Sequence, residues 1–147
     1  MKRKDIKIKW ASMYINEADM YLLREIDNIT LQPQSPEPGM ALTPEAHVVI
    51  ENTENLVIMI SLARHADRMI YSSCNVYTST GFQGCYPSPK WGPGQRTVRE
   101  TLRVRLKELQ NHRDYNGPDI DREVGRIAKR AIRELNNLCQ MSIFDML

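Results

Sequence analysis

The amino-acid sequence predicts a small, mainly helical domain. Two of the expected helices start at Thr43-Pro44 and at Thr97, because a threonine side chain can accept a hydrogen bond from a free backbone amide and apolar residues at helical spacing follow both. Between them, a stretch rich in Gly, Pro and aromatic residues from Cys74 to Arg96 predicts a long irregular loop. One globular domain is expected over residues 1–139, since this length suits a single core.

The N-terminal part of the chain predicts a short strand, a helix and a linker. Residues 6–10 alternate isoleucine or tryptophan with lysine, which is typical of a short strand. Asn16 can cap a helix over residues 17–28. The prolines and glycine within residues 32–39 then exclude regular structure.

The segment over residues 43–72 fits two structures. A polar link separates β-branched runs at residues 48–50 and 56–60, a pattern that can form a β-hairpin. We favour one long helix, because the cap at Thr43 is good and residues 62–70 continue the helical period. The hairpin, or another minor strand, would make the fold α+β and is the alternative.

Two helices are expected to close the domain. Thr97 and Glu100 form a capping box that starts a helix running to about His112. Pro118 or Asp119 opens a last helix that leads directly into the C-terminal residues. The predicted core is drawn from apolar positions of the central segment and these two helices: Leu56, Ile60, Leu102, Leu106, Ile127 and Leu135.

The composition predicts a soluble, cytoplasmic protein with no membrane partner. Hydrophobic residues make up 41% of the chain and charged residues 26%, as in ordinary globular domains, and no apolar run reaches membrane-spanning length. The basic N-terminus is followed by alternating Ile and Lys instead of an apolar stretch, so no secretory signal is expected. The three cysteines show no paired metal-ligand spacing, and reduced thiols are the default.

Positive charge is placed unevenly, although the net charge is only +2. Basic residues gather within residues 2–9, 90–107 and 122–133, and would form a phosphate-facing surface if they converged in space. Nearby acids weaken this field, so we expect weak, non-specific DNA binding at most. Loop aromatics could stack on bases beside the cations, or could instead pin the loop to the helices. The candidate nucleic-acid-binding residues are Arg122, Arg126, Arg130, Arg133, Lys90 and Arg96.

Enzyme signatures are scarce, and we expect no catalytic residue, metal ion or cofactor. Asp119, Asp121 and Glu123 could suggest a metal-dependent nuclease, but acids in the first turn of a helix are better explained by the helix dipole. Cys74 and Cys85 do not have the spacing of a compact zinc-ligand pair. The sequence also lacks the glycine-rich phosphate-binding loops of nucleotide enzymes.

The C-terminal residues 140–147 form an apolar tail that invites a partner. The residues expected to bind this partner are Gln140, Met141, Ser142, Ile143, Phe144, Met146 and Leu147. The first five resemble the short peptide by which bacterial polymerases, mismatch-repair proteins and replication regulators dock on the ring-shaped sliding clamp. The common peptide has Leu at two positions where this chain has Met141 and Ile143, and both changes keep size and apolarity.

The resemblance implies that the aliphatic-Phe pair, Ile143 and Phe144, enters a hydrophobic pocket of the clamp, while the Gln140 side chain forms a hydrogen bond at a neighbouring site. The alternative is that the apolar tail folds back on the protein's own core. We therefore expect a non-catalytic protein, of phage or mobile-element type, that binds the DNA polymerase sliding clamp and modulates or inhibits bacterial DNA replication. A clamp-recruited DNA-processing or DNA-binding accessory factor is the second hypothesis.

Overall fold

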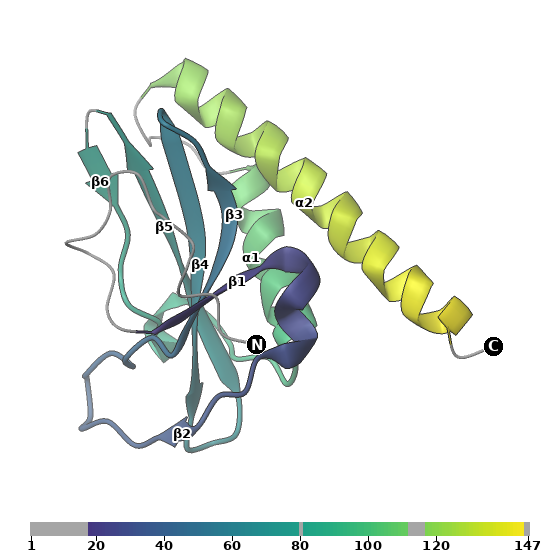
Figure 1. Ribbon diagram of the computed structural model, residues 1–147. Coiled ribbons are helices and arrows are strands. Elements are labelled where there is room, and N and C mark those ends of the chain that lie inside the picture. Colours follow the sequence, from purple (N-terminus) through teal and green to yellow (C-terminus); the bar gives the residue numbers. More distant parts are fainter. Residues whose placement is uncertain (1–17, 80, 112–116, 146–147) are drawn as a thin grey trace.

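The computed structural model describes residues 18–79, 81–111 and 117–145, and of Phe82 and residues 139–145 it describes the backbone only. Within these residues, a six-stranded mixed sheet is covered on one face by two helices (Figure 1). The strands follow the order β1-β3-β4-β5-β6, and β2 pairs with the end of β4. The prediction of a mainly helical fold is therefore wrong, and the fold is α+β.

The central hairpin consists of β3 (Ala46–Asn52) and β4 (Leu56–His65), which pair antiparallel with Val48 opposite Ile60. The long helix expected over residues 43–72 is thus replaced by the alternative hairpin. β-branched side chains lose rotamer freedom in a helix, whereas they pack well on a buried, pleated strand.

Thr43, the expected helix cap, lies in a loop and starts no helix. The Thr43 N–H donates to Gln34 Oε1 at 2.9 Å, which ties the segment to the preceding linker. The true turn of the hairpin is closed by Thr53, whose N–H and hydroxyl both donate to the carbonyl oxygen of Leu56. A local polar residue therefore fixes the hairpin register.

The irregular loop begins later than expected. β5 (Ile70–Thr78) pairs antiparallel with β4, and β6 (Gly81–Gln83) forms one edge of the sheet. Irregular chain follows over residues 84–96, interrupted by the short 3₁₀ helix η3 (Pro89–Trp91).

The other edge of the sheet is formed near the N-terminus. β1 (Asp19–Leu22) pairs parallel with β3, and the 3₁₀ helix η2 (Leu23–Asn28) follows at once. The α-helix expected over residues 17–28 is therefore wrong. β2 (Pro33–Gln34) is a two-residue strand in the linker.

Both closing helices are confirmed. α1 (Val98–Gln110) starts after Thr97, whose Oγ1 accepts a hydrogen bond from the Glu100 N–H at 3.1 Å. α2 (Pro118–Asp145) starts at the expected proline and is longer than expected. The two helices lie on the same face of the sheet (Figure 1).

The predicted core residues are confirmed as buried: Leu56, Ile60, Leu102, Leu106, Ile127 and Leu135. They lie between the sheet and the helices, where they belong to one apolar cluster. A smaller cluster of Val49, Val57, Met59 and Tyr77 lies on the other face of the sheet. The central strands are thus buried on both faces.

The expected strand over residues 6–10, the cap at Asn16 and the basic residues 2–9 lie outside the described residues. Among the helices that the structure describes, none is long and apolar enough to cross a membrane.

Candidate functional site

The residues predicted to dock on a clamp lie at the far end of α2. Helical backbone continues through five of them: Gln140, Met141, Ser142, Ile143 and Phe144. Met146 and Leu147 lie outside the described residues. Leu138, one and a half turns before Ile143, is the last described side chain that packs against the core. Beyond it the helix runs past η2 and away from the sheet (Figure 1).

The acids at the start of α2 pair with two of the predicted DNA-binding arginines. Arg122 Nη1 lies 3.6 Å from Asp119 Oδ1, one turn away. Arg126 donates to both carboxylate oxygens of Glu123, and these bonds lower the pKa of the Glu123 carboxyl. Two of the three acids that raised the nuclease alternative, Asp119 and Glu123, are therefore partners of surface arginines.

Of the other two predicted arginines of α2, one forms an ion pair and the other does not. Arg130 Nη2 lies 3.5 Å from Glu51 Oε2 on β3, so its charge is also balanced. Arg133 is exposed and forms no ion pair with any residue that the structure describes. Helical spacing alone could not separate these cases, because Glu51 is distant in sequence.

The packing of α1 against α2 adds cations that the sequence analysis did not assign to this face. The helices run antiparallel, and a Cβ atom at Gly125 would lie 3.1 Å from the backbone oxygen of Gln110. Further along, Arg103 Nη2 donates to Asn136 Oδ1 at 3.4 Å. These two contacts fix the register between the helices.

Along α1, Lys107 lies between Arg103 and Gln110, and along α2, Lys129 and Arg133 lie between Gly125 and Asn136. We call Arg103, Lys107, Lys129 and Arg133 the helical cation surface. Lys107, Lys129 and Arg133 are exposed, and within the described part of the chain none of the three has an acid partner. Such a group of unbalanced cations is the kind of surface that contacts phosphates.

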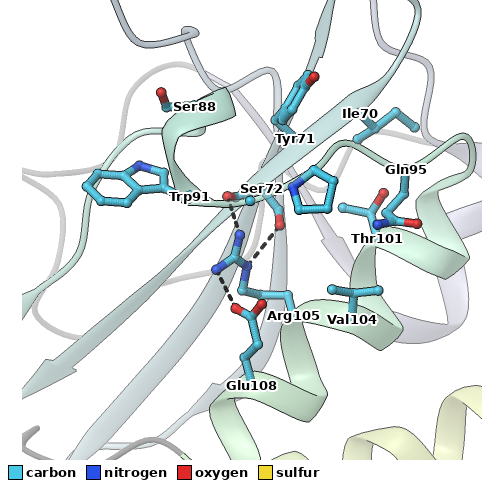
Figure 2. Close-up of a pocket in the computed structure, with 12 residues that line it drawn as sticks. Ile70, Tyr71, Ser72, Ser88, Trp91, Gln95, Thr101, Val104, Arg105 and Glu108 are labelled. Atoms are coloured by element: carbon cyan, nitrogen blue, oxygen red, sulfur yellow. Dashed lines mark hydrogen bonds and ion pairs between the residues drawn. The ribbon is translucent and has the colours of Figure 1, made fainter.

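Lys90 and Arg96 lie on the other side of α1. Lys90 belongs to η3, which packs against β5. On this side, Arg105 donates from Nε to Ser72 Oγ at 3.0 Å and from Nη2 to the Ser72 carbonyl oxygen at 2.9 Å (Figure 2). α1 thus presents Arg105 to β5 and Arg103 to α2. The structure therefore does not bring Lys90 and Arg96 together with the arginines of α2.

A buried polar network crosses the three central strands. Ser61 Oγ accepts a hydrogen bond from Asn75 Nδ2 at 2.7 Å and lies 2.8 Å from His47 Nδ1. Burial lowers the pKa of His47 to about 4. A serine beside a neutral histidine resembles a nucleophile and its base, but Ser61 is fully buried and His47 is only 3% exposed. A substrate cannot reach Oγ, so the network is structural.

The remaining candidate metal ligands are dispersed. Cys74 is half-buried on β5, and Cys85 is exposed in the following loop. Among the described residues, no group of three or more His, Cys, Asp or Glu side chains is placed to hold a metal ion.

Comparison with known proteins adds no relative. No family model, no curated protein and no solved structure matches the chain.

Proposed function

We propose that this protein docks on the bacterial DNA polymerase sliding clamp through residues Gln140 to Phe144, and thereby modulates or inhibits DNA replication. The observation that carries the proposal is the position of this segment. The resemblance falls on the end of α2 that runs away from the sheet (Figure 1), where a partner has access. This placement supports docking over folding back onto the core.

The proposed contacts follow from the resemblance. Ile143 and Phe144 enter the hydrophobic pocket, Gln140 forms a hydrogen bond beside it, and Met146 and Leu147 add apolar area. α2 holds the segment with almost no linker, because Leu138 still packs against the domain. The domain of a docked protein would therefore stand next to the pocket and hinder other clamp-binding proteins.

The proposed role places the protein with the clamp in the bacterial cytoplasm. A small protein that occupies a host's clamp pocket suits a phage or another mobile element, since blocking a pocket requires no catalytic site.

A DNA-binding accessory factor recruited by the clamp is the second candidate. The helical cation surface favours it, because three of its four members have no acid partner among the described residues. A pocket-blocking regulator requires no such surface, whereas a recruited factor should bind DNA with a strong salt dependence.

Calorimetry with a purified bacterial clamp tests the main proposal. Replacing Ile143 and Phe144 together by Ala should cost several kcal/mol of binding free energy, at about 2 or more for each buried anchor. Met40→Ala combined with Val104→Ala is the matched control, because both are exposed apolar side chains of the domain body, outside residues 140–147. Equal affinity of the wild type and the Ile143/Phe144 variant would reject docking through this segment.

A further inference from the structure

Two large aromatic side chains of the loop between β6 and α1 are half exposed, Tyr86 at 53% and Trp91 at 49%. If the aromatics served to pin this loop, their rings should be covered, as that of Tyr77 on β5 is. The exposed rings of Tyr86 and Trp91 therefore do not serve to pin the loop onto the domain.

The loop is held in place by contacts that do not involve these rings. Gln95 forms two backbone hydrogen bonds with Ile70 on β5, at 2.7 and 3.0 Å. Gly94 lies so close to the start of β5 that an added Cβ atom would be 2.6 Å from Cβ of the preceding Met69 and 2.8 Å from Tyr71 Cζ. At its other end, the Pro87 carbonyl oxygen accepts a hydrogen bond from the Leu42 N–H at 2.8 Å. The loop is thus anchored to the body of the domain at both ends.

Trp91 is fixed in orientation but not covered. Its Nε1–H donates to the Tyr86 carbonyl oxygen at 3.0 Å, and Ser88 Oγ accepts from the Lys90 N–H at 3.2 Å to start η3. The indole lies at the rim of a shallow hollow and points away from Arg105 (Figure 2). Its polar edge is satisfied, so the apolar faces of the ring are what it offers to a ligand.

The hollow beside Trp91 is too small to hold a ligand. Its volume is about 20 Å³, room for about one water molecule. The nearby Arg105 is engaged by Ser72 and by Glu108 Oε2 at 2.8 Å. A ligand would therefore lie on the exposed indole, not inside the hollow.

Two unbalanced cations flank the indole in sequence. Lys90 precedes it directly and Arg96 follows Gln95, and neither has an acid partner among the residues that the structure describes. An exposed aromatic ring with exposed cations one and five residues away along the chain offers stacking to a base and charge to its phosphates. A protein partner would favour a broader apolar surface.

We propose that Trp91, together with Lys90 and Arg96, is a binding site for single-stranded nucleic acid. An unpaired base stacks on the indole, and the adjacent phosphates pair with the two cations. Duplex DNA fits less well, because its base faces are already covered by stacking. This site is distinct from residues 140–147 and does not rest on clamp docking.

Tryptophan fluorescence tests the proposal directly. The chain contains two tryptophans, so a Trp10→Phe variant leaves Trp91 as the single indole. Titration of this variant with oligothymidylate at low salt should quench its fluorescence in a saturable manner, and a duplex of equal length should bind more weakly. Stacking of about 1–3 kcal/mol per base corresponds to an affinity loss of about 5- to 150-fold in Trp91→Leu, measured by anisotropy of a labelled oligonucleotide.

Charge variants provide a second measurement that does not depend on the ring. Lys90→Gln and Arg96→Gln should each lower the slope of log affinity against log salt by about 0.7, the value for one phosphate contact on a single strand. Arg24→Gln is the matched control, because Arg24 is exposed on η2, which directly follows β1, and β3 and β4 separate β1 from β5 in the sheet. Absence of quenching at low salt, or equal affinity of Trp91→Leu and the parent, would overturn the proposal.

Discussion

His47 Nδ1 lies 2.8 Å from Ser61 Oγ on the face of the sheet that the helices do not cover. Because Ser61 Oγ accepts from Asn75, its own proton is free to donate to His47 Nδ1. Asn75 is held in turn by the Cys85 N–H, which donates to Asn75 Oδ1 at 3.1 Å. His47 thus accepts a hydrogen bond at Nδ1, as a neutral imidazole can.

We expect acid to destabilise the fold through His47. Its pKa is about 4 in the folded protein, against 6.5 for an ordinary histidine, so between these values the unfolded chain binds the extra proton. The contribution is fully present above pH 6.5 and is lost as the pH falls from 6.5 towards 4. At about 1.4 kcal/mol per unit of pKa, the loss is about 3 kcal/mol at most. Urea unfolding at several pH values measures it.

A histidine variant assigns this pH dependence. His47→Gln should flatten the dependence of the free energy of unfolding on pH between pH 6.5 and 5, because the variant has no imidazole to protonate at this position. If His47→Gln kept the slope of the wild type, the neutral buried histidine would not be its source.

The burial of both faces of the central strands also explains why the sheet was misjudged from the sequence. A strand with one wet face alternates apolar and polar residues, but β4 is buried on both faces and reads as a continuous apolar run. Such a run carries no period of two, so it could not be separated from a buried helix. α1 and α2 were predictable because each has one solvent face, and their buried positions recur at helical spacing.

The sequence likewise predicted one part of the candidate site and not another. Spacing along one helix was enough to place Arg122, Arg126, Arg130 and Arg133 on the surface of α2. It could not show that Glu51 balances Arg130, nor that α1 packs against α2 along the stretches that carry Lys107 and Lys129, because both relations depend on tertiary packing. Part of the interface could thus be predicted, but not its net charge.

Gly94→Ala should destabilise the protein by about 1–3 kcal/mol, the usual cost of overpacking. The new Cβ atom would lie 2.6 Å from Met69 Cβ and 2.8 Å from Tyr71 Cζ, and the backbone pairing of Gln95 with Ile70 limits retreat of the loop. Gly81→Ala is the matched control, since its Cβ atom would meet nothing within 4 Å. It should change the free energy of unfolding by less than about 0.5 kcal/mol. Equal midpoints in urea would show that the loop moves freely.

The helical cation surface predicts which cations contact duplex DNA, if the protein binds it. Lys107→Gln combined with Lys129→Gln should lower the slope of log affinity against log salt by about 0.9 for each lost phosphate contact. Arg126→Gln combined with Arg130→Gln should leave this slope nearly unchanged, because Glu123 and Glu51 already occupy those side chains. Anisotropy of a labelled duplex over a range of salt concentrations measures both slopes.

The two double variants remove the same amount of positive charge, so a difference between them cannot come from net charge alone. Equal slopes would mean that the ion pairs of α2 open on DNA or that binding is diffuse, and would contradict the assignment to Lys107 and Lys129. Both variants should bind the clamp as the wild type does, since residues 140–144 are untouched. If the wild type binds no duplex even at low salt, the accessory-factor candidate loses its main support, and a regulator that only occupies the clamp pocket becomes the stronger proposal.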